Sequence, residues 1–270
     1  MKIKILVDNI SKQEELQSEH GFSAYLENSK KILFDTGTSE IIVNNARKLN
    51  INFNEIDYIL LSHNHYDHTG GLNSLLNLIK NKKLRLIIGQ NFFQEKFKRN
   101  KDKYKKISLE IINEKFLSEN FDVIVVNDFY EITKDIYVLN LRGGQSVLKD
   151  HFFIKENSLF YPDNFDEEII LLIKKENELT VLTGCCHTGI EHIIKRTNKI
   201  FSEGKIKNII GGLHLKNIKE EDYQKILELI KENKIRIYAG HCTGDERLID
   251  LAKNLKENFR KLEVGLEIII

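Results

Sequence analysis

Three histidines and one aspartate lie within six positions of the sequence, at His63, His65, Asp67 and His68. Imidazole and carboxylate groups are common ligands of zinc and other first-row metals. On an irregular turn, the first two histidines could bind one ion, while Asp67 and His68 face a second ion about 3.5–4 Å away. The alternative is a polar loop in which histidines cluster by chance, and the order of these residues makes it the weaker interpretation. The cluster therefore predicts a metal site.

The segments on either side of this cluster indicate its place in the fold. Residues 56–61 are mostly apolar and include β-branched side chains, which predicts a buried strand. Gly70 and Gly71 begin an expected helix over residues 72–80. The cluster is thus predicted to occupy the turn between a strand end and a helix start, where α/β folds commonly place ligand sites.

Three further histidines occupy turns of the same kind. Each follows a predicted strand and precedes a predicted helix: His187 after residues 178–183, His214 after 206–210, and His241 after 235–239. Repeated strand–turn–helix units bring such turns to one edge of a sheet, where a shared site can form. We expect His187 to complete the ligands of the first ion and His241 those of the second. Asp67 and His214 are the expected catalytic residues. His214 is expected to exchange a proton or hold a substrate oxygen, with metal binding as the alternative.

Other polar residues have settings that are less informative. A thiolate at Cys185 could bind or bridge metals, although structural burial is the more frequent role of cysteine, so its role stays open. Asp163 and Glu167 are expected in surface turns, with a position at the site as the alternative for either one. The remaining histidines are interpreted as surface or packing residues; they are His20, His151 and His192.

The most basic part of the chain, residues 96–106, has two interpretations. The preferred one is a solvated helix or loop, and the alternative is a platform that attracts a phosphorylated substrate. Residues 90–120 are also where a lid could be inserted.

The remaining sequence predicts two β-layers with helices outside. Expected strands cover residues 2–8, 23–28, 32–35, 85–89, 107–112, 123–126, 136–141, 169–174 and 262–270, and a helix capped by Thr38 or Ser39 runs to residue 49. The net charge of +1 argues against a nucleic-acid partner. Because the sequence has no signal peptide, no apolar run of membrane-spanning length and an odd number of cysteines, we expect a cytoplasmic protein without a membrane partner.

The H-x-H-x-D-H order at 63–68, together with Phe34-Asp35-Thr36-Gly37, resembles the metallo-β-lactamase-fold superfamily. The resemblance implies a four-layer αββα sandwich of mixed sheets with helices outside, formed by residues 1–270 as one domain. It also implies that Asp35 orients metal ligands without binding metal itself. The superfamily's third histidine usually stands midway along the chain, and His187 takes over its role here.

Three later segments narrow the resemblance to one branch of the superfamily. They are Gly184-Cys185-Cys186-His187-Thr188-Gly189-Ile190, Gly211-Gly212-Leu213-His214-Leu215 and His241-Cys242-Thr243-Gly244. The branch is known by the name 7,8-dihydropterin-6-methyl-4-(β-D-ribofuranosyl)aminobenzene-5′-phosphate synthase. Membership implies two divalent ions, zinc first with manganese, magnesium or iron as alternatives, and a phosphorylated small-molecule substrate. The enzyme would be a hydrolase, or a transferase that releases pyrophosphate.

Two other functions compete with this one. The same ligands accept iron, so an iron-dependent redox protein is possible, although no flavin domain accompanies the motifs. A non-enzymatic metal-binding module is the second alternative, and the additional strand-end histidine His214 disfavours it. Sequence alone predicts neither the oligomeric state nor the substrate.

Overall fold

The computed structural model describes residues 1–76, 78–79, 84–148 and 150–270. One seven-stranded sheet has the order β18-β1-β2-β3-β4-β5-β8. Its strands are β1 (Lys2–Val7), β2 (Ser23–Glu27), β3 (Lys31–Phe34), β4 (Tyr58–Leu60), β5 (Leu84–Gly89), β8 (Phe121–Val126) and β18 (Glu267–Ile269). From β3 to β8 neighbouring strands are parallel, whereas the pairs from β18 to β3 are antiparallel.

A second seven-stranded sheet has the order β17-β16-β15-β14-β13-β10-β9. Its strands are β9 (Phe129–Thr133), β10 (Ile136–Asn140), β13 (Ile169–Lys175), β14 (Glu178–Thr183), β15 (Lys205–Gly212), β16 (Arg236–Gly240) and β17 (Phe259–Lys261). The strands β14 to β17 are parallel, so β14, β15 and β16 end at the same edge of the sheet.

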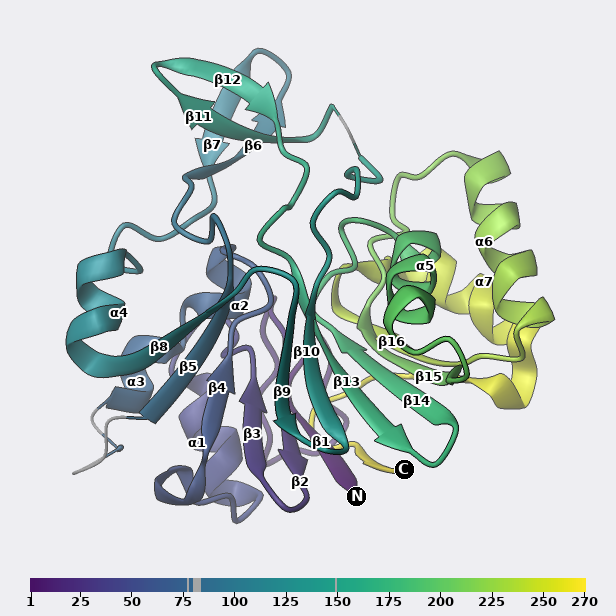
Figure 1. Ribbon diagram of the computed structural model, residues 1–270, viewed down its shortest axis with the longest axis horizontal. Coiled ribbons are helices and arrows are strands. Elements are labelled where there is room, and N and C mark those ends of the chain that lie inside the picture. The colour runs from purple at the N-terminus through teal and green to yellow at the C-terminus, as the bar shows by residue number, and fades with distance from the viewer. Residues whose placement is uncertain (77, 80–83, 149) are drawn as a thin grey trace.

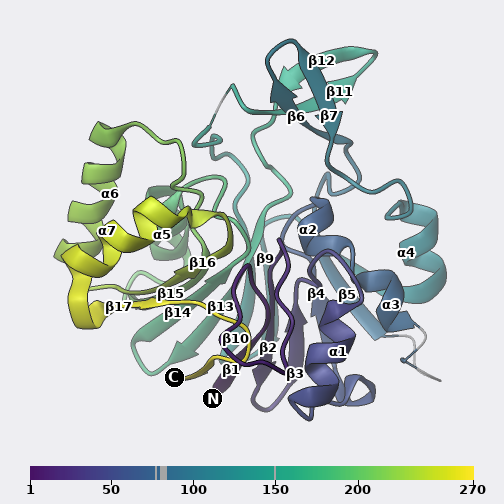
Figure 2. The same ribbon diagram turned by 180° about the vertical axis from the view of Figure 1, so that it is seen from behind.

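The two sheets pack face to face, with helices on both outer faces (Figures 1 and 2). Phe34, Leu171 and Ile210 belong to the fully buried apolar cluster formed by residues of both sheets. The helices α1 (Ile41–Lys48), α3 (Leu72–Leu76) and α4 (Glu114–Asn120) accompany the first sheet, and α5 (Ile190–Ile200), α6 (Glu220–Glu232) and α7 (Asp245–Leu255) the second. This arrangement confirms the predicted αββα sandwich.

The outer helices are held by apolar side chains at helical spacing. In α6, Tyr223, Leu227 and Ile230 are buried at intervals of four and three residues, whereas the positions between them are mostly polar. Each such side chain contributes roughly 1.5–3 kcal/mol when it is fully buried. The packing fixes the helix start, and with it the turn that follows β15.

A third, smaller sheet stands beyond one edge of the sandwich (Figure 1). It consists of β6 (Lys96–Asn100), β7 (Lys103–Lys106), β11 (Phe152–Glu156) and β12 (Leu159–Pro162), in the order β12-β11-β6-β7. Tyr104 stacks on Phe160 with ring centroids 3.8 Å apart, and Phe97 meets Phe160 edge-on. The preferred prediction of a helix or loop over 96–106 is therefore wrong, because these aromatic residues make the basic segment a β-hairpin.

Several element predictions need correction. Residues 107–112 form turns rather than a strand, and the sequence interpretation missed α4 and β9. Glu40, not Thr38 or Ser39, holds the position before α1, although the Ser39 hydroxyl accepts a hydrogen bond from the backbone N–H of Ile41. The helix expected over 72–80 ends at Leu76, and its residues 77 and 80 lie outside the described part. No helix among the described residues is long and apolar enough to span a membrane.

Candidate metal centre

His63, His65 and His187 form the first of two groups of candidate ligands. His63 and His65 lie in the turn after β4, and His187 lies in the turn after β14. The His63 Nε2 atom is 3.0 Å from His65 Nδ1 and 3.2 Å from His187 Nε2. Burial lowers the pKa of all three imidazoles well below the usual histidine range. The rings are therefore neutral near pH 7, and their nitrogen lone pairs can bind a cation.

Asp67, His68 and His241 form the second group. Asp67 and His68 belong to the short helix α2 (Tyr66–Thr69), and His241 directly follows β16. The His241 Nε2 atom is 3.2 Å from both His68 Nε2 and Asp67 Oδ2. Two nitrogen atoms and one carboxylate oxygen therefore converge, a donor set that suits a divalent first-row metal.

Hydrogen bonds behind the second group fix how its rings point. Asp35 Oδ2 lies 2.7 Å from His68 Nδ1, and Asn9 Oδ1 lies 3.1 Å from His241 Nδ1. Because each oxygen accepts the Nδ1–H, the Nε2 atom of each ring faces the centre. Ser62 donates its backbone N–H and its hydroxyl to Asp35, both at 2.7 Å. Asp35 thus lies directly behind His68, held by Ser62.

The second group also attracts positive charge. Burial alone would lower the pKa of His68, but the carboxylates of Asp35 and Asp67 outweigh it and raise that pKa to about 9. Burial would likewise raise the pKa of Asp67, and the neighbouring imidazoles of His68, His20 and His241 instead hold it well below the usual range. The chemistry of these donors fits a divalent cation.

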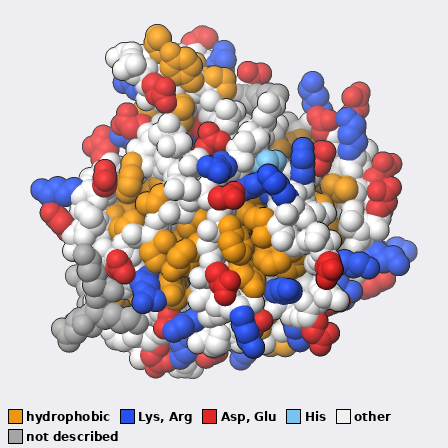
Figure 3. Space-filling view, viewed as in Figure 1, with side chains coloured by type: hydrophobic (Ala, Val, Ile, Leu, Met, Phe, Trp, Pro, Cys, Tyr) orange, Lys and Arg blue, Asp and Glu red, His pale blue; other side chains and the backbone are white. Residues whose placement is uncertain are grey.

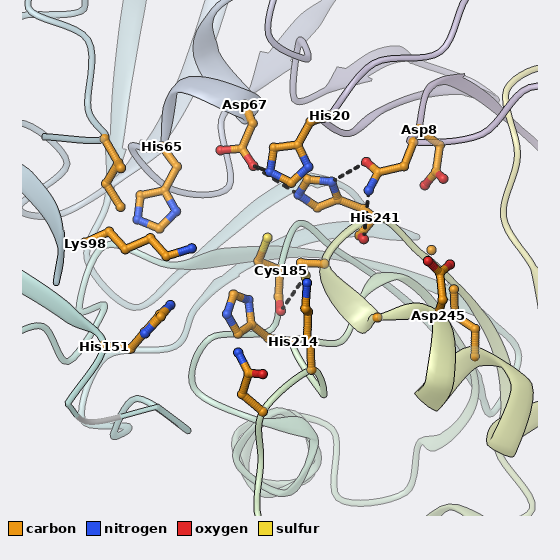
Figure 4. Close-up of a pocket in the computed structure, with 18 of the residues that line it drawn as sticks. Asp8, His20, His65, Asp67, Lys98, His151, Cys185, His214, His241 and Asp245 are labelled. Atoms are coloured by element: carbon orange, nitrogen blue, oxygen red, sulfur yellow. Dashed lines mark hydrogen bonds and ion pairs between the residues drawn. The ribbon is translucent and has the colours of Figure 1, made fainter. Parts of the chain in front are cut away.

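Both groups border one cavity of about 520 Å³. His65, Asp67, Cys185, His214 and His241 line it from the sandwich, and the small sheet with its flanking turns contributes Lys98, Lys105, His151 and Phe152 (Figure 4). The small sheet projects from the rest of the molecule at the top of the space-filling view (Figure 3). The small sheet therefore forms one wall of the pocket, and its β6–β7 hairpin lies within residues 90–120, where a lid could be inserted.

His214 lies in the pocket but in neither of these two groups. Its ring centroid is 4.4 Å from that of His187, and its Nδ1 atom is buried without a hydrogen-bond partner among the described residues. The backbone of His214 is left-handed, with a φ of 48°, as is that of His241 at 44°. Such conformations are uncommon for residues other than glycine, and they concentrate at functional sites.

Two histidines interpreted as surface or packing residues also line the pocket. His20 Nε2 lies 3.2 Å from Asp67 Oδ2, and His151 lies in the pocket wall beside β11. Neither follows a predicted strand, so their sequence setting gave no indication of this position. His192 is a packing residue as expected, because its Nε2 meets the carbonyl oxygen of Leu141 at 2.8 Å.

The expectation that Asp163 and Glu167 occupy surface turns is wrong. Both are buried, and Lys96 Nζ lies 2.9 Å from Asp163 and 2.8 Å from Glu167. The ammonium group also lies 5.4 Å from the ring centroid of Phe165, which in turn stacks on His187. One buried ion cluster thus connects the small sheet to the first group of ligands.

Comparisons with known proteins agree with this geometry. Residues 20–145 match the Metallo-beta-lactamase superfamily. The 7,8-dihydropterin-6-methyl-4-(beta-D-ribofuranosyl)-aminobenzene-5′-phosphate synthase of Methanocaldococcus jannaschii is 31% identical over 265 residues, which cover 92% of this chain and 89% of the relative. The chain belongs to the metallo-β-lactamase superfamily. An uncharacterised protein of the same organism is 32% identical and covers 93% of this chain and 94% of its own length.

Two solved structures match the whole chain. A structure described as a metal-dependent hydrolase of the β-lactamase superfamily has a TM-score of 0.84 and 29% identity, and covers 100% of this chain and 99% of its own. The zinc-bound PqqB of Methylobacterium extorquens shares the fold, with a TM-score of 0.61, 10% identity and complete coverage of both chains. The predicted family and fold are therefore confirmed.

Proposed function

We propose that this protein is a binuclear metal-dependent enzyme, a hydrolase or a transferase, that acts on a phosphorylated small molecule. The observation that carries the proposal is the meeting of two three-residue donor groups at one pocket. His63, His65 and His187 would hold one divalent ion, and the second group, Asp67, His68 and His241, would hold the other. When bound, such ions supply Lewis-acid chemistry and lower the pKa of bound water towards neutrality.

The donor types favour zinc. Five of the six proposed ligands are imidazoles, which suit zinc and iron, whereas magnesium and calcium sites are built mainly from oxygen atoms. Zinc is therefore the first metal to test, and iron the second.

The pocket's cations support a phosphorylated substrate. Lys98 and Lys105 are directly opposite each other in the β6–β7 pair, and both line the pocket. Like charges at such positions repel, and neither lysine forms an ion pair with a carboxylate in the part of the chain that the structure describes. An anionic group between them would remove this repulsion. Lys216 also lines the pocket.

His214 is the proposed proton donor or acceptor. Its unpaired Nδ1 atom and its position in the pocket wall allow it to exchange a proton with a substrate oxygen or to hold that oxygen. Asp67 would bind metal at the reacting centre and is proposed as the second catalytic residue.

The synthase named among the relatives suggests a specific reaction of this kind. Its product joins a dihydropterin methylene group to an aminobenzene ribosyl phosphate. In the reaction that we propose, the amino nitrogen of the aminobenzene ribosyl phosphate attacks the methylene carbon of a pterin methyl pyrophosphate, and a carbon–nitrogen bond forms. The carbon–oxygen bond breaks, pyrophosphate leaves, and the nucleophile loses one proton. A cavity of about 520 Å³ is within the usual range for a small-molecule site.

The proposal is tested by mixing zinc-loaded protein with a dihydropterin methyl pyrophosphate, with and without the aminobenzene ribosyl phosphate. Pyrophosphate release that requires the acceptor supports the transferase, and phosphate or pyrophosphate release without the acceptor supports the hydrolase. Release that is unchanged in the double variant His63→Ala/His241→Ala would contradict the proposal, since it could not come from this centre. Absence of release from the loaded wild type under both conditions would contradict this substrate class.

A further inference from the structure

Cys185 lies between the two groups of candidate ligands. Its sulfur is 3.2 Å from His68 Nε2 in the second group. It also lies within 4.8 Å of the ligand atoms of both His63 and His187, and within the same limit of those of both His68 and His241. One sulfur atom is therefore within reach of both proposed ions.

We infer that the Cys185 thiolate is a metal ligand that bridges the two ions. This inference rests on the proposed binuclear centre. A thiolate binds zinc at about 2.3 Å, so one sulfur can touch two ions separated by up to roughly 4.6 Å. The usual spacing in two-metal sites, about 3.5–4 Å, falls within that limit. On binding, the S–H proton leaves to solvent, and the sulfur lone pairs form the two bonds to metal.

The surroundings of Cys185 favour this role over structural burial. The side chain is only 2% exposed, yet its sulfur faces imidazole nitrogens and lines the pocket. The adjacent Cys186 shows the contrasting case, because it belongs to the apolar cluster of the second sheet and helices α5 to α7. The backbone of Cys186 is left-handed, with a φ of 56°, so the side chains of Cys185 and Cys186 have different surroundings although they are neighbours in sequence.

No carboxylate is placed to bridge in the same way. Asp67 is the sole carboxylate in the candidate metal groups of the described residues, and the ligand atoms grouped with it are those of His20 and His241. A bridging thiolate would make the centre selective, because soft sulfur ligands favour zinc and iron over magnesium and manganese.

X-ray absorption of the zinc-loaded protein counts sulfur atoms around each ion directly. The inference predicts one sulfur per zinc at about 2.3 Å in the wild type. The sulfur signal should disappear in Cys185→Ser and persist in the matched controls Cys186→Ser and Cys242→Ser. Because the wild-type spectrum already gives the sulfur count, the test does not depend on the folding of the variants.

Half a sulfur per zinc would mean that the thiolate binds one ion without bridging, and no sulfur would mean that it is not a ligand. Either result would overturn the inference, as would a signal lost in Cys242→Ser but kept in Cys185→Ser. The zinc content of the same samples is measured separately. Fewer than two zinc ions per chain would contradict the proposed function, whereas two ions without the sulfur would contradict the bridge alone.

Discussion

The ring of Phe165 lies parallel to the imidazole of His187, with centroids 3.8 Å apart and an interplanar angle of 3°. Phe165 is fully buried, and the Glu168 carboxylate accepts a hydrogen bond from the backbone N–H of His187 at 2.7 Å. The candidate ligand is therefore held by a stacked ring on one side and by a fixed backbone on the other.

Replacing Phe165 with Leu should loosen this ligand. We expect Phe165→Leu to weaken binding of one metal ion on the order of 10-fold, the lower end of effects seen when residues behind a ligand change. Competition with a chelator measures the affinity. Phe153→Leu is the control, since Phe153 packs against Tyr104 in the small sheet. Equal affinities in both variants would show that the stacking has no positioning role.

Asp35 should affect the other ion. Asp35→Asn keeps the side-chain shape but removes the negative charge that accepts the His68 Nδ1–H. Binding at the second group should weaken about 10- to 100-fold, while the first group retains its ion. Stepwise titration with a chelator measures the metal affinities of the two groups separately. Asp57→Asn, which alters a carboxylate bound to Lys30, should leave both affinities unchanged. Loss of the first group's ion instead would contradict the assignment of Asp35.

The paired lysines of the small sheet should affect substrate binding rather than metal binding. Lys98→Ala and Lys105→Ala should each raise KM for the phosphorylated substrate on the order of tenfold, because a charge-assisted hydrogen bond is lost. The zinc content should stay the same. Lys103→Ala, on the same hairpin but not among the pocket residues, is the matched control. If Lys103→Ala raises KM as much as the other two, general charge attraction is responsible and the pocket assignment is wrong.

The buried ion cluster should govern stability. Lys96→Met leaves the buried carboxylates of Asp163 and Glu167 without their cation, and we expect a loss of about 3–5 kcal/mol in the free energy of unfolding. Urea denaturation measures this loss. A change below about 1 kcal/mol, the range of exposed ion pairs, would contradict the structure of the cluster.

Glu167 should make the free energy of unfolding depend on pH, and its raised pKa sets the direction of that dependence. Burial raises the pKa of Glu167 from 4.5 to about 7, against the opposing charge of Lys96. The folded protein thus binds this proton more tightly than the unfolded chain does. The stabilisation that comes from this tighter proton binding at Glu167 is complete below pH 4.5 and disappears as the pH rises through 7. Wild type should therefore lose stability relative to Glu167→Gln between pH 5 and 8, as measured by urea unfolding. A constant difference would contradict the raised pKa.

The sequence predicted the elements that periodicity governs. The strand Glu178–Thr183 has the predicted bounds and is a run of consecutive buried residues after Glu178, and the helix Glu220–Glu232 follows the His214 turn as predicted, with buried residues at helical spacing. The turns that hold His63, His187, His214 and His241 were found because each follows such a strand. Of the predicted site residues, all except His214 lie in the two donor groups or, as Asp35 does, directly behind them.

Residues brought to the pocket by tertiary packing could not be found in this way. His20 lies in a loop, and Lys96 looked like one lysine among many in a basic segment. Lys96 is buried because the small sheet folds back over Asp163 and Glu167, which are about 70 positions later in the sequence. The local sequence pattern around a residue does not indicate contacts with residues so far away in the sequence.

The most direct test of the binuclear centre is the number of metal ions per chain in protein purified without chelator. Elemental analysis should find two divalent ions in the wild type and one in each of His65→Ala and His241→Ala, because each variant removes a ligand from a different group. One ion in the wild type, unaffected by His241→Ala, would contradict the account.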